Sequence, residues 1–452
     1  MEREKLGSRL GFILLSAGCA IGIGNVWKFP YMTGQNGGGF FVLFYLLFLV
    51  LFGVPIMAME FSVGRAARKS PVKMFQKLEK KGTFWHFHGY ICMLGNYLLM
   101  MFYTVVAGWM LYYVYASITG LYHSMNNKQI VDVFKGLLNN PMILFICTCT
   151  IIISGFFILS IGLENGLEKV TKIMMLFLIV LIIILAIHSL FLKGGMKGLA
   201  FYLKLDFKKL AEIGIGNVVI GALTQAFFTL SIGMGSMAIF GSYINKEHTL
   251  LGESINVAFL DTFVALCSGL IIFPACAAYG VDVDSGPGLL FITLPNVFNH
   301  LPLGNIWGSL FFLFMLFAAF STVLAVFETI TACCMDLFHL NRKKACMMNI
   351  ILMILLALPC LLGFNILSGI HPLGAESSIL DLEDFIVSHL ILPIGSMIFL
   401  IFCVSRYGWG WKNFIKEVNT GEGLQFKKWM YPYLKYILPI IIFIVFIIGI
   451  IK

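Results

Sequence analysis

The sequence has little charge for its length, and this shortage decides its class. Of 452 residues, 12% are Asp, Glu, Lys or Arg, whereas 60% are hydrophobic and 43 are Phe. Soluble domains carry about 25% charged residues. The mean hydropathy of +0.93 and this composition exclude a soluble protein and predict an all-α polytopic membrane protein.

Groupings of reactive side chains are also scarce. The 9 His are scattered, and the 11 Cys lie almost wholly in apolar segments without His partners at metal-binding spacing. No nucleophile elbow, phosphate-binding loop or cluster of acids and His appears, so we expect no enzyme, no organic cofactor and no zinc or copper site. The net charge of +9 does not indicate nucleic acid, because the basic residues are distributed as in membrane proteins.

Apolar runs predict eleven transmembrane helices, since about 20 apolar residues cross the bilayer core. We place them near residues 11–34, 39–64, 87–119, 141–160, 170–192, 214–243, 252–280, 304–338, 346–364, 376–404 and 431–451. Most Lys and Arg then lie on the side of the N-terminus, above all in 65–81. This predicts a cytoplasmic N-terminus and an external C-terminus. The external loop 193–209 carries five lysines and goes against the rule.

The first and the sixth predicted helices are interrupted in mid-span. Gly18, Gly22, Gly24 and Asn25 interrupt the first, and the sequence TLSIGMG at 229–235 interrupts the sixth. A break in hydrocarbon leaves backbone groups that need partners from protein, water or a ligand. Taken alone, each stretch is as readily a helix-packing face or a kink. As a pair five helices apart, they predict a 5+5 inverted repeat with a binding site at the membrane midplane.

The residues around the first break carry a family resemblance. Residues 9–12 (RLGF), 22–31 (GIGNVWKFPY), 36–40 (NGGGF) and 53–56 (GVPI) resemble the opening signature of the neurotransmitter:sodium symporter family, in its prokaryotic, leucine-transporter-like branch. The resemblance extends through the tenth helix. It implies a cytoplasmic tail at 1–10, inverted repeats at 11–192 and 214–404 separated by an external loop at 193–213, a cytoplasmic loop at 405–430 and an additional helix at 431–452.

The resemblance implies an amino-acid site between the two breaks. Backbone amides of Ile23 and Gly24 would face the substrate carboxylate, and the Tyr103 hydroxyl would donate to it. An isolated Tyr in an aromatic-rich helix more often serves packing alone. Gly22 stands where monoamine-carrying relatives have Asp, so an amino acid is implied rather than an amine.

The remaining substrate-binding residues that the resemblance implies lie on several helices. Carbonyls of Phe228, Thr229 and Ser231 would accept from the ammonium group. The side-chain pocket would be apolar, which favours hydrophobic or aromatic amino acids. The full expected set is Ala20, Gly22, Ile23, Gly24, Leu99, Tyr103, Phe228, Thr229, Ser231, Met234, Val323 and Val326.

Asp261 lies at membrane depth in the predicted seventh helix. A charge there is costly, so such an acid is functional by default, the alternative being a structural pair. The resemblance implies a first sodium site made by Asp261 with Ala20, Asn25, Thr229 and the substrate's carboxylate. The family commonly has Asn at this position, and its animal members use chloride beside a Ser where this chain has Ala265. We therefore expect chloride independence, with Asp261 supplying the negative charge.

Adjacent hydroxyls lie in the predicted eighth helix, at Ser321 and Thr322. Such hydroxyls usually bond to a carbonyl of their own helix. The resemblance implies instead a second sodium site, formed by these hydroxyls and the carbonyls of Gly18, Ile21 and Ala318. An all-oxygen shell suits a hard cation such as Na⁺, so two sodium ions are expected.

Charged residues at both ends of the site resemble the gates of the family. Lys28 and Asp384 would close the outer side, where the family usually has Arg in the first position; Lys offers a point charge rather than a bidentate fork. Arg3 and Asp336, with Tyr243 nearby, would close the inner side. Exposed charges without this context usually contribute little.

The sequence thus predicts a sodium-coupled symporter that imports a hydrophobic or aromatic amino acid by alternating access, in the bacterial inner membrane. A transporter of another small amino-acid-like solute, and a relative that binds without transporting, remain open alternatives. A channel would need a continuous polar pore or repeated filter segments, which the sequence lacks. The sequence does not specify the amino acid, because one methylene changes binding by only about 1–3 kcal/mol.

Overall fold

The computed structural model describes residues 4–122, 125–280, 288–299, 301–375 and 377–451, and every regular element within these ranges is a helix. Nine uninterrupted helices in these ranges are long and apolar enough to cross a membrane. The first span adds a tenth crossing, bent by 55° at its break, and a second bent pair, Phe207–Ile213 with Ile215–Thr229 at 90°, adds an eleventh. All eleven overlap the spans predicted from hydropathy, and the predicted all-α membrane architecture is confirmed.

The spans follow one another in chain order, several of them with a π-helical turn. They are α1 (Arg9–Ala20), η1 (Gly24–Lys28) and α2 (Phe29–Gln35); α3 (Gly39–Phe48), η2 (Leu49–Gly53) and α4 (Val54–Ala67); α6 (His86–Ile118); α8 (Pro141–Ile161); η3 (Leu163–Glu168) and α9 (Lys169–Leu190); α12 (Ile215–Thr229) and α13 (Ser236–Gly241); α14 (Leu250–Tyr279); α16 (Gly304–Phe338); α17 (Arg342–Leu362); α18 (Ile379–Phe385), η5 (Ile386–Ile391) and α19 (Leu392–Val404); and α21 (Met430–Pro432), η6 (Tyr433–Ile437) and α22 (Leu438–Ile451).

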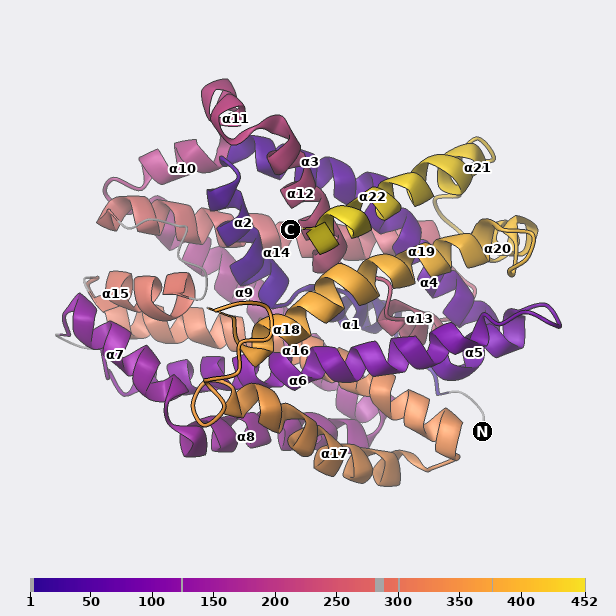
Figure 1. Ribbon diagram of the computed structural model, residues 1–452, viewed down its shortest axis with the longest axis horizontal. Coiled ribbons are helices and arrows are strands. Elements are labelled where there is room, and N and C mark those ends of the chain that lie inside the picture. Colours follow the sequence, from indigo (N-terminus) through magenta and orange to yellow (C-terminus); the bar gives the residue numbers. More distant parts are fainter. Residues whose placement is uncertain (1–3, 123–124, 281–287, 300, 376, 452) are drawn as a thin grey trace.

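Shorter helices lie between the spans. They are α5 (Pro71–Leu78), α7 (Asn127–Leu138), α10 (Met196–Leu203), α11 (Phe207–Ile213), η4 (Leu289–Thr293), α15 (Leu294–Asn299) and α20 (Trp411–Val418). In Figure 1 most spans run side by side along the long axis, with α7 and α15 at one end and the tip of α5, α20 and the N-terminus at the other. We call these the α7 end and the α20 end.

The first span stops being helical at Ala20. Ile21 adopts an extended conformation with ψ 104°, and helical geometry resumes as the π-helical turn η1. Gly22 and Gly24 flank this interruption, and glycine loses the least by leaving a helix. Carbonyls of α1 therefore lack the helical partners that an unbroken span would supply.

The sixth span is interrupted between Thr229 and Ser236. Gly233 and Gly235 have φ values of 102° and 75°, in the region that glycine adopts without strain. Ser231 has φ 51°, which costs a non-glycine residue on the order of 1–3 kcal/mol. Strain of this size persists only where the surroundings hold the backbone in place, so the break is a fixed feature of the packed interior.

Large apolar side chains cover much of the outer surface of the bundle. Phe157, Phe177 and Phe259 project from α8, α9 and α14 with most of their surface exposed. Such residues are stable in contact with lipid chains and not with water. The polar groups of the two breaks lie in the interior instead.

Candidate substrate and ion sites

A small interior cavity, of about 20 Å³, lies between the two broken spans. Polar atoms come from Tyr103, Ser231 and Thr322, and the rest of the wall is largely apolar. Its lining residues are Ala20, Gly22, Gly24, Leu99, Tyr103, Phe228, Ser231, Met234, Thr322, Val387 and Leu392. A mainly apolar lining with a few convergent polar groups is typical of a small-molecule site.

The polar part of this cavity surrounds Gly22. A Cβ atom there would lie 2.3 Å from the Tyr103 hydroxyl oxygen and 2.6 Å from Thr322 Oγ1. The Ile23 amide donates to the same Tyr103 oxygen at 3.0 Å. Only glycine lets the two hydroxyls lie this close to the backbone of the first break, and a small anionic group beside them would meet hydroxyl donors.

Two hydrogen bonds join the two broken spans, and a third lies within the first break. Ser231 Oγ donates to the Cys19 carbonyl at 3.2 Å, and Gln225 Nε2 donates to the Gly24 carbonyl at 2.9 Å. Within the first break, the Gly22 amide donates to Asn25 Oδ1 at 3.2 Å. The interrupted segments therefore meet directly, as their pairing in the sequence predicts.

Five oxygens converge where the resemblance places the second sodium site. Ser321 Oγ lies 3.1, 3.5 and 2.9 Å from the carbonyl oxygens of Gly18, Ile21 and Ala318. Thr322 Oγ1 lies 3.1, 3.1 and 3.4 Å from the same three oxygens. Two hydroxyls facing three carbonyls form a donor set that fits a hard cation, since each hydroxyl can turn a lone pair toward the ion.

Asp261 is fully buried and surrounded by the residues expected at the first sodium site. Asn25 Nδ2 donates to Asp261 Oδ1 at 2.7 Å, and Thr229 Oγ1 donates to Asp261 Oδ2 at 3.1 Å. Ala20 lines the adjoining cavity. A buried carboxylate with neutral partners among the described residues carries a charge that a cation would balance.

Two further residues near Asp261 escaped the sequence analysis. Tyr45 donates its hydroxyl to Asp261 Oδ2 at 3.4 Å. Gln225 is buried and bonds the first break, while its Oε1 atom has no hydrogen-bond partner. Neither position forms a local pattern with Asp261, so only the packed fold brings them together.

The second break is also held by Glu60 and Asn96. Glu60, fully buried on α4, accepts the Gly233 amide. Asn96 Nδ2 donates to the Met234 carbonyl at 2.9 Å, and Ser236 Oγ donates to Asn96 Oδ1 at 2.9 Å. These groups satisfy backbone atoms that the missing helical turn leaves unpaired.

Lys28 closes one side of the cavity. Its Nζ atom lies 3.7 Å from Asp384 Oδ2 and 3.7 Å from the centroid of the Phe228 ring. Asp384 Oδ1 also accepts from Ser388 Oγ at 2.6 Å. Because Phe228 lines the cavity, the ammonium group joins the α18 carboxylate to the cavity wall.

Tyr243 takes part in a network of charged side chains at the α20 end. It donates its hydroxyl to Glu328, which Arg342 contacts at 2.6 and 3.0 Å. Arg342 also contacts Glu4 at 2.6 Å. Of these four residues, only Tyr243 was expected from the sequence.

Asp336, expected at the inner gate, contacts the residues that precede α5. Asp336 Oδ2 accepts the Ser70 amide at 2.8 Å, and Asp336 Oδ1 lies 3.9 Å from Lys69 Nζ. Arg3 lies outside the described residues, so the expected Arg3–Asp336 pair remains a prediction. Asp336 is nevertheless fixed to the start of α5.

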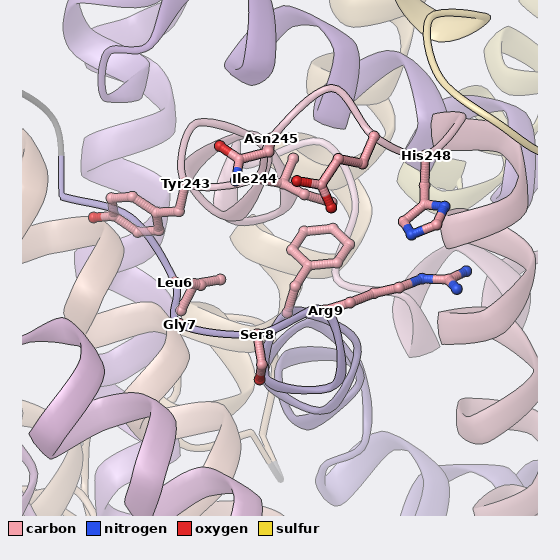
Figure 2. Close-up of a pocket in the computed structure, with 10 residues that line it drawn as sticks. Leu6, Gly7, Ser8, Arg9, Tyr243, Ile244, Asn245 and His248 are labelled. Atoms are coloured by element: carbon pink, nitrogen blue, oxygen red, sulfur yellow. The ribbon is translucent and has the colours of Figure 1, made fainter.

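A second cavity, of about 160 Å³, lies at the α20 end between residues 6–9 and residues 243–248 (Figure 2). Phe12 also lines it. Arg9 projects along its side and pairs with Glu253 of α14 at 2.8 Å. The start of the first span and the turn after α13 are therefore joined by few contacts across this space.

Four of the expected substrate-binding residues do not line the cavity: Ile23, Thr229, Val323 and Val326. The two valines are fully buried elsewhere in α16, and Val323 faces Gly155 of α8. Val387 and Leu392 of the tenth span take part in the wall instead. They are five residues apart at a π-helical turn, where i and i+5 lie close in angle, and no residue pattern indicates this turn.

Comparison with known proteins gives consistent matches along the chain. The model of the sodium:neurotransmitter symporter family matches residues 3–135 and 122–452. An uncharacterized sodium-dependent transporter, YhdH, of Bacillus subtilis is 32% identical over 443 residues, covering 97% of this chain and 96% of that protein. A second uncharacterized sodium-dependent transporter, of Methanocaldococcus jannaschii, is 34% identical over 424 residues, covering 90% and 83%.

Among solved structures, that of MhsT in complex with L-phenylalanine is similar, with a TM-score of 0.88 and 39% sequence identity. The match covers 98% of this chain and 99% of MhsT. It confirms the predicted fold of eleven spans with a 5+5 inverted repeat and broken first and sixth helices.

Proposed function

The chain belongs to the sodium:neurotransmitter symporter family, and from this premise we propose that it imports a hydrophobic or aromatic amino acid together with two sodium ions. The observation that carries the proposal is the close approach of the Tyr103 and Thr322 hydroxyls to Gly22 at the wall of the cavity. A substrate carboxylate in the cavity would accept from these hydroxyls, and a side chain larger than hydrogen at position 22 would displace them. An amine without a carboxylate would leave these donors without a charged partner.

The nature of the side-chain pocket supports the proposed substrate class. Leu99, Phe228, Met234, Val387 and Leu392 surround the cavity, and they offer no charged group to a substrate side chain. Met234 can adapt to substrates of different shape, because its unbranched chain is flexible. The similar protein MhsT has L-phenylalanine in its complex, which supports an aromatic or large apolar amino acid here.

Coupling follows from the closeness of the expected ion and substrate sites. In the proposed mechanism the substrate carboxylate is itself a ligand of the first sodium ion, next to Asp261 and Asn25. Sodium then strengthens substrate binding and substrate strengthens sodium binding by the same factor. The second ion, held by Gly18, Ile21, Ala318, Ser321 and Thr322, would stabilise the contact between α1 and α16.

We further propose that transport does not need chloride. In its ionised form, Asp261 would supply a negative charge beside the first sodium site, where Asn25 and Thr229 donate to it. The human GABA transporter 2, which is 27% identical over 76% of this chain and 64% of its own length, is named sodium- and chloride-dependent. Ala265, one helical turn from Asp261, has no group that could bind an anion.

Alternating access would use the two closing networks in turn. Lys28 and Asp384 would separate to open the external side, and Tyr243, Glu328, Arg342 and Glu4 would separate to open the cytoplasmic side. The excess of basic residues at the α20 end supports a cytoplasmic N-terminus. We place the protein in the bacterial inner membrane with its C-terminus outside.

A competition experiment tests the proposed substrate class. Each of the twenty amino acids competes against a labelled aromatic amino acid for binding to the purified protein in sodium, and the series is repeated in lithium or potassium. We expect strong competition by large apolar amino acids in sodium and little binding in potassium. Competition by amines that lack a carboxylate, or equal binding in potassium, would contradict the proposal. Binding without uptake into proteoliposomes would instead identify a non-transporting relative.

A further inference from the structure

The residues between the fifth and sixth spans include the lysine-rich loop that the charge rule leaves unexplained. This 191–209 segment begins directly after α9 ends at Leu190 and contains α10 and the start of α11. In Figure 1 α10 lies at the α7 end, along the side of the bundle. The segment therefore starts where the fifth span leaves the membrane.

One face of α10 is fixed to the protein. Tyr202 is fully buried; its ring stacks on Phe273 of α14 at 5.0 Å, and its hydroxyl donates to the Leu266 carbonyl at 3.1 Å. A Cβ atom on Gly198 would lie 2.0 Å from the Phe273 carbonyl oxygen, so the two helices touch backbone to backbone. The position of α10 is thus determined by packing on α14.

The opposite face of the segment exposes apolar and basic side chains together. Phe191 is 82% exposed, Met196 66%, Leu203 54% and Phe207 73%. Between them, Lys193, Lys197, Lys204 and Lys208 are also exposed. Exposed apolar side chains of this size match those on the lipid-facing sides of the spans, and water is a poor environment for them.

We propose that the 191–209 segment binds anionic phospholipids in the leaflet at the α7 end. The lysines would contact the headgroup phosphates, and Met196, Leu203 and Phe207 would enter the boundary of the acyl chains. An amphipathic element with basic and apolar residues side by side binds an interface in this way, and an anionic leaflet attracts each lysine near its surface. This also explains why five lysines persist in a loop where the charge rule predicts few.

The lysines of the segment are not equivalent. Lys209 lies over the Phe201 ring, 4.1 Å from its centroid, which occupies its ammonium group. Asp206 accepts the backbone amides of Lys209 and Lys208, and the Lys209 amide is the main reason that the pKa of Asp206 lies below its ordinary value. Asp206 thus remains ionised as the cap of α11. Lys197 and Lys204, on the exposed face of α10, are the most suitable positions for a test.

The test uses a tryptophan placed on the exposed face, Leu203→Trp, in nanodiscs that hold one copy of the protein. The parent spectrum is subtracted to remove the seven native Trp. The acyl chains of either phosphatidylglycerol or phosphatidylcholine carry bromine, which quenches a nearby tryptophan. We expect blue-shifted emission and several-fold stronger quenching by brominated phosphatidylglycerol.

Two double variants in the Leu203→Trp background separate specific binding from general charge. Lys197→Gln with Lys204→Gln should remove the preference for phosphatidylglycerol, a loss on the order of tenfold in relative affinity. Lys128→Gln with Lys135→Gln removes two exposed lysines from α7 and should leave the preference unchanged.

Three results would overturn the proposal. Emission typical of water with no quenching by either lipid would show that the segment does not reach the membrane. Equal quenching by both lipids, unchanged by loss of Lys197 and Lys204, would show apolar contact without headgroup recognition. Quenching that appears only when two copies share a disc would show that a second copy of the chain covers this face. None of these readouts depends on transport.

Discussion

Replacing Gly22 by Ala should nearly abolish amino-acid binding while leaving the fold intact. The added methyl group would lie 2.3 Å from the Tyr103 hydroxyl oxygen and 2.6 Å from Thr322 Oγ1. Neither oxygen is free to retreat: Tyr103 accepts the Ile23 amide at 3.0 Å, and Thr322 contacts the carbonyls of Gly18 and Ile21 at 3.1 Å. The methyl group would also push these hydroxyls away from the positions in which they are proposed to donate to the substrate carboxylate.

The size of the effect follows from the hydrogen bonds to the carboxylate. Loss of one hydrogen bond from Tyr103 or Thr322 to the charged carboxylate costs about 1.5–3 kcal/mol, which corresponds to a loss in affinity of about 10- to 160-fold. The overpacking cost of about 1–3 kcal/mol acts on the stability of the protein instead. The assay is equilibrium binding of a labelled amino acid to the purified protein in saturating sodium, with thermal unfolding of the ligand-free protein as the check on folding.

A matched control separates the site from a general effect of Gly→Ala. Gly216 lies near the start of α12, in the other broken span, and a Cβ atom there would meet nothing within 4 Å. Gly216→Ala should therefore bind with the affinity of the wild type. If Gly22→Ala folds normally and binds within threefold of the wild type, the carboxylate does not accept from the Tyr103 and Thr322 hydroxyls and the reasoning fails.

Three further predictions concern the ions and the inner closure. Asp261→Asn removes the charge that faces the first sodium site, worth up to about 4 kcal/mol at 4 Å and an effective dielectric of 20. Sodium should therefore bind at least tenfold more weakly (roughly 1.4 kcal/mol), and substrate binding should become sensitive to replacement of chloride by gluconate. Chloride sensitivity of the wild type would contradict the role of Asp261. Thr322→Val removes a proposed sodium ligand and should raise the half-saturating sodium concentration on the order of tenfold. The control is Thr329→Val, which should leave that concentration unchanged, because the Thr329 hydroxyl bonds only the Ala325 carbonyl at 3.2 Å among the contacts described. Equal effects of the two substitutions would refute the assignment. Arg342→Met leaves Glu328 buried without its cation and should destabilise the protein by about 3–5 kcal/mol in thermal or denaturant unfolding. Stability should recover when Arg342→Met is combined with Glu328→Met. A double variant as unstable as the single one would show that the pair does not act as a unit.

Hydropathy and local breaks predicted the architecture well, because both leave marks that are local in the sequence. A span needs only a run of apolar residues, and the glycines around Ile23 and Met234 mark where such a run stops being helical. The family resemblance then placed Ser321 and Thr322 opposite Gly18, a contact between residues that are 303 and 304 positions apart. No periodicity in the sequence could have supplied that contact.

The positions that the sequence missed depend on helix phase and on long-range packing. The π-helical turn η5 shifts the phase of the tenth span and turns Val387 and Leu392 toward the cavity, where Val323 and Val326 were expected. Glu328 and Arg342 lie on neighbouring spans and meet Tyr243 from a third. Each of these side chains alone resembles an ordinary residue of an apolar or basic segment.

The most direct test of the account is uptake of a labelled hydrophobic amino acid into proteoliposomes that contain only this protein. With sodium outside, potassium inside and no chloride on either side, we predict saturable accumulation above the external concentration, and its collapse when potassium replaces the external sodium. Uptake that only equilibrates, or that proceeds equally in potassium, would contradict the claim that the two broken spans couple an amino acid to sodium.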